Sequence, residues 1–452
     1  MHLGVLGMSE KLIKESTFVS FDGTVELCTS HQRPDRYRHI EMVFEGQHRI
    51  VRGGGYSFSA ASFGENILVQ EMSSFDRFLD FDPVCKTVKV EAGMPLGRLQ
   101  SWAMKRALYF PVLPGYPEIT IGGCVAVDAH GKNPSKDGTF SEWVTAINLF
   151  HPTYGYMRLS KDENKEAFGL TCGGFGMTGI IIDVTLQLVE LPSNAFEVRK
   201  IPVASLNDAI KILAEYSDKS DFIYSWHDGT RRDEAFGAGV VFGGSWMKGN
   251  KVQIKPRSKE MIMTASSRAK MPFSVWNRFS VSVANRLFMA MNKSRPFEIL
   301  DADKATFPFA YNTLYHRFYG STGFTEIQVL VSHHVVKIFA KKLQDLVERF
   351  NPPLVMISLK MFSGKQESLS LAGDGYLIAF NFFRSSKLKE FLEQIDQLVI
   401  EIGAQPNLSK DSRISRELAS QTLPNYAGFK SRLNAFDPLR LYRSELSNRI
   451  DV

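Results

Sequence analysis

The 452-residue sequence contains only four cysteines, Cys28, Cys85, Cys124 and Cys172, and no two of them form a CxxC pair. Zinc sites and disulfide frameworks need closely or regularly spaced cysteines, so we expect neither a metal site nor a disulfide-stapled fold. A reducing compartment is the simplest interpretation of this spacing.

Long apolar runs are also absent. No window holds the roughly 18 consecutive apolar residues that a transmembrane helix needs. The first stretch, MHLGVLGMSEKLIKES, has too short an apolar run for a signal peptide. We therefore expect any membrane contact to be peripheral. The expected location is the cytoplasm or the surface of the inner membrane, with a periplasmic location left open.

Charge is nearly balanced. The formal net charge is +6, and 44% of the residues are hydrophobic and 23% charged. These values fit a soluble globular protein with a substantial core. The mild positive charge suits anionic partners, and we expect no nucleic acid among them. The length exceeds that of a usual single domain, so we expect two domains or one domain with a large insertion.

Hydrophobic periodicity predicts an α+β fold. Short β-branched runs between glycine-rich turns predict strands in residues 48–59, 66–72, 86–94 and 178–191, and later in 326–332 and 375–383. Apolar residues at helical spacing predict helices at 95–108, 335–350 and 386–403. Asn351-Pro352-Pro353 should end the second of these helices, because proline cannot continue it.

The pattern of predicted elements changes near residue 193, from strands with glycine-rich turns to strands mixed with amphipathic helices, and it changes again near residue 406. We therefore predict a first domain over 1–192, a second over 193–405, and a return to the first over 406–452. Residues 248–295 are strongly basic, with Glu260 as their single acid, and Met, Phe and Trp residues are interleaved. This composition suits a surface that lies on anionic lipid. The alternative is a solvated insertion with a few core anchors.

Three glycine clusters each lie next to a predicted strand: Gly53-Gly54-Gly55, Gly122-Gly123 and the run from Gly173 to Gly179. Glycine lets backbone N–H groups approach an anion closely, so such turns can hold phosphate oxygens. No GxxxxGK[ST] string occurs and no GxGxxG opens a helix, which disfavours P-loop and Rossmann sites. A dinucleotide held between strand-connecting loops remains.

Several motifs carry a family resemblance. VRGGGYSFS, PVLPGYPEITIGGCVAVDAHGKN and CGGFGMTGII are similar to the PCMH-type FAD-binding domain of the vanillyl-alcohol-oxidase superfamily. Within it, the chain most resembles the decaprenylphosphoryl-β-D-ribose 2′-oxidase family, the flavin subunits of an epimerase that makes a lipid-linked arabinose donor for the cell wall. Four further segments match in order, and they are Trp226-His227-Asp228, Lys360-Met361-Phe362, Lys410-Asp411-Ser412-Arg413 and Asp437-Pro438-Leu439-Arg440.

The resemblance implies a two-domain vanillyl-alcohol-oxidase-like fold, in which an antiparallel-sheet substrate domain covers the flavin. It also implies the residues that bind FAD: Gly53, Gly54, Gly55, Tyr56, Ser57, Gly122, Gly123, His130, Gly176, Gly179 and Lys410. Many relatives attach FAD covalently through a histidine at the position of Tyr56. We therefore expect FAD to bind non-covalently here.

The same resemblance implies catalytic roles for Lys410, His130 and Lys132, and a sugar pocket formed by Lys132, Trp226, Gln328, Lys360 and Lys410. Flavin oxidation of a secondary alcohol needs a group that stabilises the hydroxyl proton or the charge that develops. The expected activity is oxidation at C2 of a polyprenyl-phosphoryl ribose. A separate NAD(P)H-dependent short-chain reductase would complete the 2′-epimerisation.

Two features of the sequence keep alternatives open. Mycobacterial members of the family carry a cysteine where this chain has Ala379, and the neighbouring Leu377 and Asn381 also differ. The substrate could therefore be a free sugar, oxidised by a soluble aldonolactone or alditol oxidase. A flavoprotein that has lost activity and serves as a membrane-associated binding subunit is a third reading. Oxygen and a quinone are both open as electron acceptors, and the oligomeric state is open as well.

Overall fold

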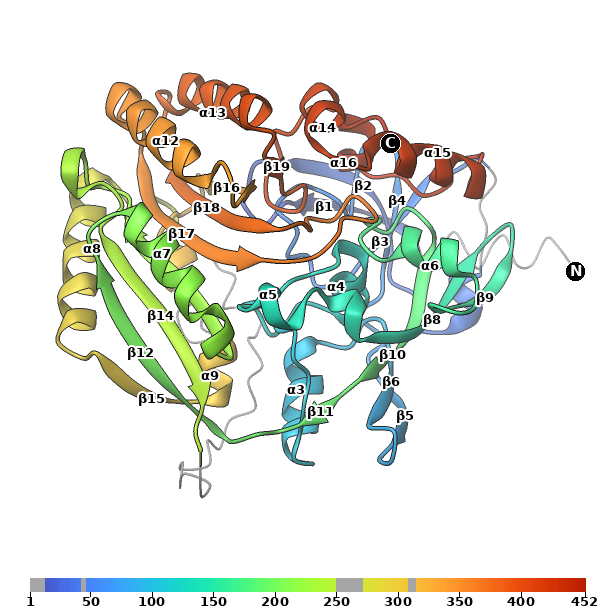
Figure 1. The fold of residues 1–452 in the computed structure, drawn as a ribbon. Coiled ribbons are helices and arrows are strands. Elements are labelled where there is room, and N and C mark those ends of the chain that lie inside the picture. The colour runs from blue at the N-terminus through green and yellow to red at the C-terminus, as the bar shows by residue number, and fades with distance from the viewer. Residues whose placement is uncertain (1–12, 42–45, 249–270, 308–313) are drawn as a thin grey trace, which may run out of the picture.

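The computed structural model describes residues 13–41, 46–248, 271–307 and 314–452, and it shows two groups of sheets with a run of C-terminal helices above them (Figure 1). The N-terminal group is built from smaller sheets, whereas one large sheet dominates the other group. The predicted α+β class is confirmed.

Two sheets form most of the N-terminal group. The four-stranded sheet has the order β1-β2-β4-β3, in which β4 pairs in parallel with β2 and β3. The five-stranded sheet is antiparallel, with the order β5-β6-β10-β8-β9, and a small β11-β7 pair lies apart. The strands are β1 Ile13–Val19, β2 Glu26–Gln32, β3 Arg49–Arg52, β4 Leu68–Glu71, β5 Phe78–Asp82, β6 Thr87–Glu91, β7 Leu108–Tyr109, β8 Val144–His151, β9 Gly155–Leu159, β10 Ile180–Gln187 and β11 Val189–Glu190.

Some predicted elements are shorter than expected. The predicted strand over 48–59 ends at Arg52, because the glycines that follow turn the chain away from the sheet. The predicted helix over 95–108 spans only Leu96–Met104, as α3. Ala107 has a positive φ of 56°, so the chain leaves the helix there and enters β7.

The second group contains an eight-stranded sheet that is antiparallel throughout, with the order β15-β12-β14-β13-β17-β18-β16-β19. The predicted antiparallel sheet is therefore confirmed. Its strands are β12 Ala195–Val203, β13 Phe222–Asp228, β14 Gly239–Trp246, β15 Phe297–Asp301, β16 Phe324–Ser332, β17 Leu354–Phe362, β18 Gly375–Phe383 and β19 Gln405–Pro406.

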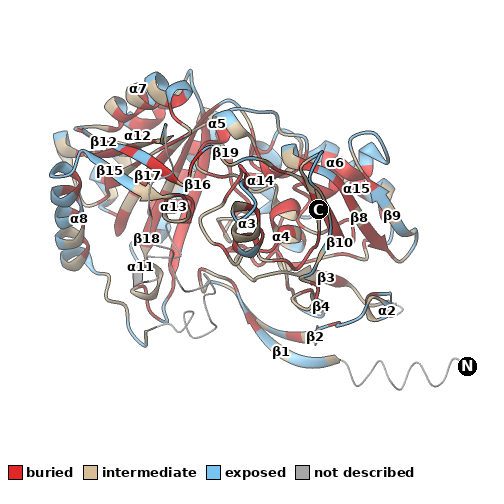
Figure 2. Ribbon diagram, turned by 90° about the horizontal axis from the view of Figure 1, so that it is seen from below, coloured by how far each residue is buried: buried red, intermediate tan, exposed pale blue. Residues whose placement is uncertain are grey.

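Helices cover one face of this sheet. α7 Leu206–Tyr216, α12 Val336–Phe350 and α13 Leu388–Ile402 place their apolar stripes on it, and together they bury the largest hydrophobic cluster of the protein (Figures 1 and 2). Asn351 ends α12 in the left-handed conformation, with φ 47°, and two prolines follow, as predicted. The other face of the sheet points toward the N-terminal group and toward α8 Arg278–Lys293.

The remaining helices are short. They are α2 Tyr37–Ile40, α4 Ile121–Val127, α5 Pro134–Asp137, α6 Lys165–Thr171, α9 Ala302–Thr306, α11 Leu314–Arg317, α14 Arg416–Thr422, α15 Tyr426–Phe436 and α16 Glu445–Arg449. No helix among the described residues is long and apolar enough to cross a membrane.

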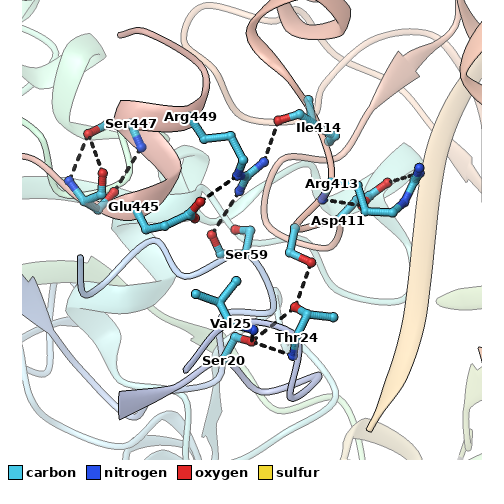
Figure 3. Close-up of polar contacts among 12 residues, drawn as sticks. Ser20, Thr24, Val25, Ser59, Asp411, Arg413, Ile414, Glu445, Ser447 and Arg449 are labelled. Atoms are coloured by element: carbon cyan, nitrogen blue, oxygen red, sulfur yellow. Dashed lines mark hydrogen bonds and ion pairs between the residues drawn. The ribbon is translucent and has the colours of Figure 1, made fainter. Parts of the chain in front are cut away.

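The C-terminal segment ties the two groups together. The Arg49 N–H donates to Leu441 O at 2.9 Å, and the Arg443 N–H donates back to Arg49 O at 3.0 Å. Arg449 donates to Ile414 O and to Ser59 O (Figure 3). The tail thus contacts β3 directly. The limits of the three predicted domains stay predictions.

The predicted basic segment 248–295 is described only in part, because residues 249–270 lie outside the described residues. The cations at Lys251, Lys255, Arg257, Lys259, Arg268 and Lys270 therefore have no structural account. The described part contains α8, which exposes the apolar side chains of Phe279, Val283, Leu287 and Met291, whereas Phe288 is 38% exposed and packs on Trp226. Arg286 and Lys293 are exposed on the same helix, which contains no acid.

Candidate active site

A cavity of about 810 Å³ lies between the two groups of sheets. Its N-terminal wall consists of the three glycine turns and the segment that ends in His130, Gly131 and Lys132. Its opposite wall consists of the uncovered face of the eight-stranded sheet, and Lys410 closes it from the C-terminal segment. All the site residues predicted from the sequence line this one cavity: Gly53, Gly54, Gly55, Tyr56, Ser57, Gly122, Gly123, His130, Lys132, Gly176, Gly179, Trp226, Gln328, Lys360 and Lys410.

The first two glycine turns pack tightly against neighbouring segments of the chain. A Cβ on Gly54 would lie 2.5 Å from Glu118 O, and one on Gly122 would lie 2.9 Å from the Ala92 Cβ. Neither space admits a side chain without movement of the chain. These positions therefore require glycine, and their backbone borders the cavity directly.

The third turn needs glycine for its backbone conformation as well. Gly176 has φ +79° and Gly179 has φ +137°, values that other residues rarely adopt. A Cβ on Gly179 would also lie 2.6 Å from Phe150 O. The chain then enters β10 in the centre of its sheet. Three glycine turns with exposed backbone along one cavity form a cradle that fits the pyrophosphate of a dinucleotide such as FAD.

Alternate residues of strands β16, β17 and β18 form part of the opposite wall. In β16, Ile327 and Val329 enter the core under the helices, whereas Glu326 and Gln328 line the cavity. In β18, Ala379 and Asn381 line the cavity, and their neighbours Ile378 and Phe380 enter the core. In β17, Lys360 faces the cavity and Leu359 the core. Side chains of a strand alternate between faces, so one strand supplies both the core and the site.

The KDSR segment holds Lys410 in place. Arg413 forms an ion pair with Asp411 at 2.7 Å, and Thr24 donates a hydrogen bond to Ser412 Oγ at 2.7 Å (Figure 3). Arg413 also forms an ion pair with Asp396 at 3.1 Å. These contacts fix the segment to both groups of sheets. The Lys410 Nζ then lies 3.6 Å from Glu326 Oε1 and 3.8 Å from the centroid of the Phe58 ring. The ammonium is therefore bound by a carboxylate and an aromatic face.

Lys360 and Lys132 bring further positive charge into the cavity. The Lys360 Nζ donates to Gly131 O at 3.3 Å, and the Lys132 Nζ lies 5.3 Å from the Phe222 ring centroid. Within the described part of the chain, neither lysine forms an ion pair. Two cations without a carboxylate partner suit an anionic group of a ligand, such as a phosphate.

Burial perturbs the protonation of these groups. Burial, with a smaller contribution from the charge of Lys410, lowers the pKa of Lys360 to about 8. Burial and the charge of Lys360 lower the pKa of Lys132 well below its usual value. Burial, followed by the charge of Lys360, lowers the pKa of His130 to about 3. His130 is therefore a neutral imidazole. Its Nδ1 lies 3.1 Å from Gly131 O and donates to it, which leaves the Nε2 lone pair as an acceptor.

Sequence reasoning missed Glu326, the acid beside Lys410. Burial alone would raise the pKa of Glu326, but the ammonium of Lys410 and a hydrogen bond from Asn381 outweigh burial and lower that pKa. The signal was present: Glu326 and Gln328 are polar residues spaced two apart within the strand-like run EIQVLVS. Polar residues at alternate positions of a buried strand predict a polar cavity on one face.

The roles of the individual site residues stay predictions. The Tyr56 hydroxyl donates to Glu118 Oε2 at 3.2 Å, and no histidine stands at this position to bond a flavin. Non-covalent binding likewise stays a prediction. The cradle, the cations and the neutral imidazole together can hold a dinucleotide, bind an anionic substrate and polarise a hydroxyl group.

Comparisons with known proteins agree with this chemistry. Residues 42–156 match the family described as FAD binding domain. A decaprenylphosphoryl-β-D-ribose oxidase of Mycolicibacterium smegmatis is 25% identical over 415 residues, which cover 90% of each chain. A D-lactate dehydrogenase of Anaerostipes hadrus is 26% identical over 212 residues, 46% of this chain and 42% of its own. A mitochondrial L-galactono-1,4-lactone dehydrogenase of Brassica oleracea is 28% identical over 180 residues, 38% of this chain and 30% of its own.

These matches confirm three predictions. The chain contains a PCMH-type FAD binding domain, its cofactor is FAD, and it is an oxidoreductase similar to enzymes that act on alcohol groups. The matched span 42–156 contains the first two glycine turns and the HGKN residues, whereas the third turn and Lys410 lie outside it. The resemblance to the ribose oxidase extends over both groups of sheets.

Proposed function

We propose that this FAD-dependent oxidoreductase oxidises a secondary hydroxyl of a lipid-linked sugar phosphate, C2 of a polyprenyl-phosphoryl ribose. The observation that carries the proposal is the single cavity that joins the glycine cradle to Lys132, Lys360 and Lys410. The likeness to the ribose oxidase over 90% of the chain supports the choice of sugar. The cavity is within the size range of small-molecule sites.

In this proposal the glycine turns bind the cofactor, and Lys410 and His130 bind the reacting hydroxyl. When bound, FAD supplies the ring that accepts two electrons and a hydrogen from the sugar C–H bond. Gly54, Gly122 and Gly179 let the backbone approach the pyrophosphate. Lys410 donates a hydrogen bond to the reacting hydroxyl, and the neutral Nε2 of His130 accepts one. The reaction turns an alcohol into a ketone, so the hydroxyl proton must leave to a base or to water.

The far part of the cavity suits the rest of the substrate. Lys132 and Lys360 bind the phosphate by charge-assisted hydrogen bonds. Beyond Lys132 the cavity wall is aromatic, and its rings are Phe222, Tyr224, Trp226, Phe242 and Phe288. Trp226 and Phe288 are in contact, with ring centroids 4.4 Å apart. An apolar chain attached to the phosphate can lie along this wall.

A membrane contact through α8 follows from the same substrate, because a long prenyl tail stays in the bilayer. The exposed apolar side chains of α8, together with Arg286 and Lys293, suit an anionic lipid surface. We expect the protein in the cytoplasm or on the surface of the inner membrane, with a periplasmic location left open. A separate NAD(P)H-dependent reductase would reduce the ketone on its other face and complete the epimerisation.

Liposome sedimentation tests the contact. The double variant Phe279→Asp/Leu287→Asp should lose binding to vesicles that contain anionic lipid, whereas Val84→Asp should not. Val84 is 87% exposed and lies far from α8, on the β5–β6 turn. Equal sedimentation of both variants and the wild type would refute the contact at α8.

Anaerobic reduction of the bound flavin tests the activity. We expect farnesyl-phosphoryl ribose to bleach the flavin absorbance and free ribose to bleach it much more slowly. Lys410→Met should slow the bleaching by about 100-fold or more, because the hydroxyl loses its charged donor. Lys430→Met is the matched control, since Lys430 pairs with Asp451 at the surface and lines no part of the cavity.

A free-sugar oxidase is the second candidate, and one observation favours it. Glu326, Gln328 and Asn381 present uncharged and negative groups that can bind sugar hydroxyls without any phosphate. The similarity to a galactonolactone dehydrogenase points the same way. Faster bleaching by aldonolactones or alditols than by the prenyl-phosphoryl sugar would establish this function instead. No bleaching by any of these compounds would refute both.

A further inference from the structure

Glu326 is a buried carboxylate in the wall of the catalytic cavity, only 9% exposed. Three side-chain donors surround its two oxygens. Gln328 Nε2 donates to Oε1 at 2.7 Å, Asn381 Nδ2 donates to Oε2 at 2.8 Å, and the Lys410 ammonium lies 3.6 Å from Oε1. A buried charge is costly unless it is paired and hydrogen-bonded, and this one is both.

The same network reaches the loop that carries Lys410. Asn407 Nδ2 donates to Gln328 Oε1 at 2.9 Å, and the Asn407 N–H donates to Gln328 O at 2.9 Å. The Lys410 N–H in turn donates to Asn407 O at 3.0 Å. Strand β16 and the Lys410 loop are thus joined through backbone and side chains on both sides of Glu326.

Three carboxylates of the described residues line the cavity, and Glu326 is the one that pairs with Lys410: Glu298 pairs with Lys200, and Asp128 accepts hydrogen bonds from Thr139 and Ser141. Lys360 and Lys132 form no ion pair within the described part of the chain, and Lys410 pairs with Glu326 alone. Like charges in a cavity of low polarity repel one another over several ångströms. Without Glu326, Lys410 and Lys360 would repel each other, and no carboxylate among the described residues would pair with either.

We propose that Glu326 is a positioning residue that fixes the Lys410 ammonium at the reacting end of the cavity and balances the positive charge of Lys410 and Lys360. The inference rests on the proposed function, because it assumes that Lys410 meets the reacting hydroxyl. Glu326 would also determine which way round the substrate binds in the cavity. The carboxylate keeps anionic groups away from the reacting end, so the phosphate of the substrate binds at Lys132 and Lys360.

Three variants separate positioning from a merely structural role. Glu326→Gln keeps the size and the hydrogen-bonding length of the side chain but removes its charge. Glu326→Asp keeps the charge on a shorter side chain. Asp183→Asn is the matched control: Asp183 is buried, pairs with Lys89 at 3.3 Å, accepts from Asn148 at 2.9 Å, and does not line the cavity.

The first readout needs no substrate. The midpoint potential of the bound flavin should become more positive in Glu326→Gln, since loss of a nearby negative charge favours the reduced cofactor. It should be close to the wild-type value in Glu326→Asp and in Asp183→Asn. In a Lys410→Met background, kcat should be the same with and without Glu326→Gln, because a positioning residue acts through its partner.

The second readout is kinetic. Glu326→Gln should lower kcat by about 10-fold or more, and Glu326→Asp should recover part of that loss. The charged and titratable groups that Glu326 influences are Lys410, Lys360, His316, Tyr116, Tyr315 and Tyr319. Among them, Glu326 raises the pKa of Lys360. Without Glu326 that pKa should be lower, so Lys360 should lose its charge, and KM for a phosphorylated substrate should rise, at a lower pH than in the wild type.

An unchanged midpoint potential and an unchanged pH dependence of KM in Glu326→Gln would overturn the inference. So would a loss of kcat from Glu326→Gln that persists undiminished in the Lys410→Met background. A wild type that oxidises no sugar would instead overturn the proposed function. The midpoint potential would still decide whether Glu326 balances the charge of the cavity.

Discussion

Lys360 should give the enzyme an alkaline limit that a single substitution can remove. Its pKa is lowered to about 8, first by burial and then by the charge of Lys410. The lysine is therefore mostly charged at pH 7 and mostly neutral at pH 9. A phosphate gains charge-assisted hydrogen bonds only from the charged form, so substrate binding should weaken as the pH rises through 8.

The size of the effect follows from the titration curve. With a pKa of about 8, the charged fraction falls about tenfold between pH 7 and pH 9. KM for a phosphorylated substrate should rise by up to the same factor, while kcat changes little. Lys360→Arg should abolish the rise, because a guanidinium keeps its charge throughout this range. Lys360→Met should show the high KM at every pH.

Steady-state kinetics at pH 7 to 9 provides the measurement, with a free sugar of the same ring as the control substrate. A substrate without phosphate should show no such rise in KM. The reasoning about Lys360 is wrong if the rise persists in Lys360→Arg, or if phosphorylated and free sugars show the same rise.

Three other outcomes are expected. Gly54→Val should purify with little FAD, measured as the ratio of flavin to protein absorbance, because its Cβ would lie 2.5 Å from Glu118 O. Burial lowers the pKa of His227 to about 4. Below pH 6.5 the histidine therefore takes up a proton in the unfolded chain but not in the folded protein, so the free energy of unfolding decreases as the pH is lowered. Between pH 7 and pH 5 urea unfolding should show about 2 kcal/mol less acid destabilisation for His227→Gln than for the wild type and for the exposed-site control His334→Gln. Thiol reagents should modify the exposed Cys28 and Cys85 of the native wild type, and Ala379→Cys should add one adduct, blocked by substrate; an Ala379→Cys variant that gains no further adduct would contradict this.

Local pattern was sufficient to predict much of the fold. The apolar stripes over 335–350 and 386–403 gave helices within two residues of α12 and α13, because both bury a continuous face against the sheet. Strands β16 and β18 were also predicted, from their β-branched and aromatic residues. The strand over 48–59 was too long, since the three glycines favour a turn whatever their neighbours.

The site was harder to predict from pattern alone. Gly122 lies more than 200 residues before Lys360 and Lys410, and nothing local shows that the three share a cavity. Motifs matched to a family brought them together. Glu326 belonged to no motif, so it was missed, although its alternation with Ile327 carried the information. Pairing between distant strands decides which polar residues meet, and single-sequence patterns do not encode that pairing.

The alternation along β16, β17 and β18 has a consequence for how the enzyme can change. Alternate positions of these strands lie on opposite faces of the sheet. Ile357, Leu359 and Ile378 pack in the hydrophobic core, whereas Ser358 and Ala379 line the cavity. Substitutions at the cavity-facing positions can reshape specificity and leave the core under the helices intact. Single substitutions in such a sheet can therefore change which sugar the enzyme accepts. An insertion of one residue, in contrast, would turn core residues into the cavity and cavity residues into the core, and would disrupt both.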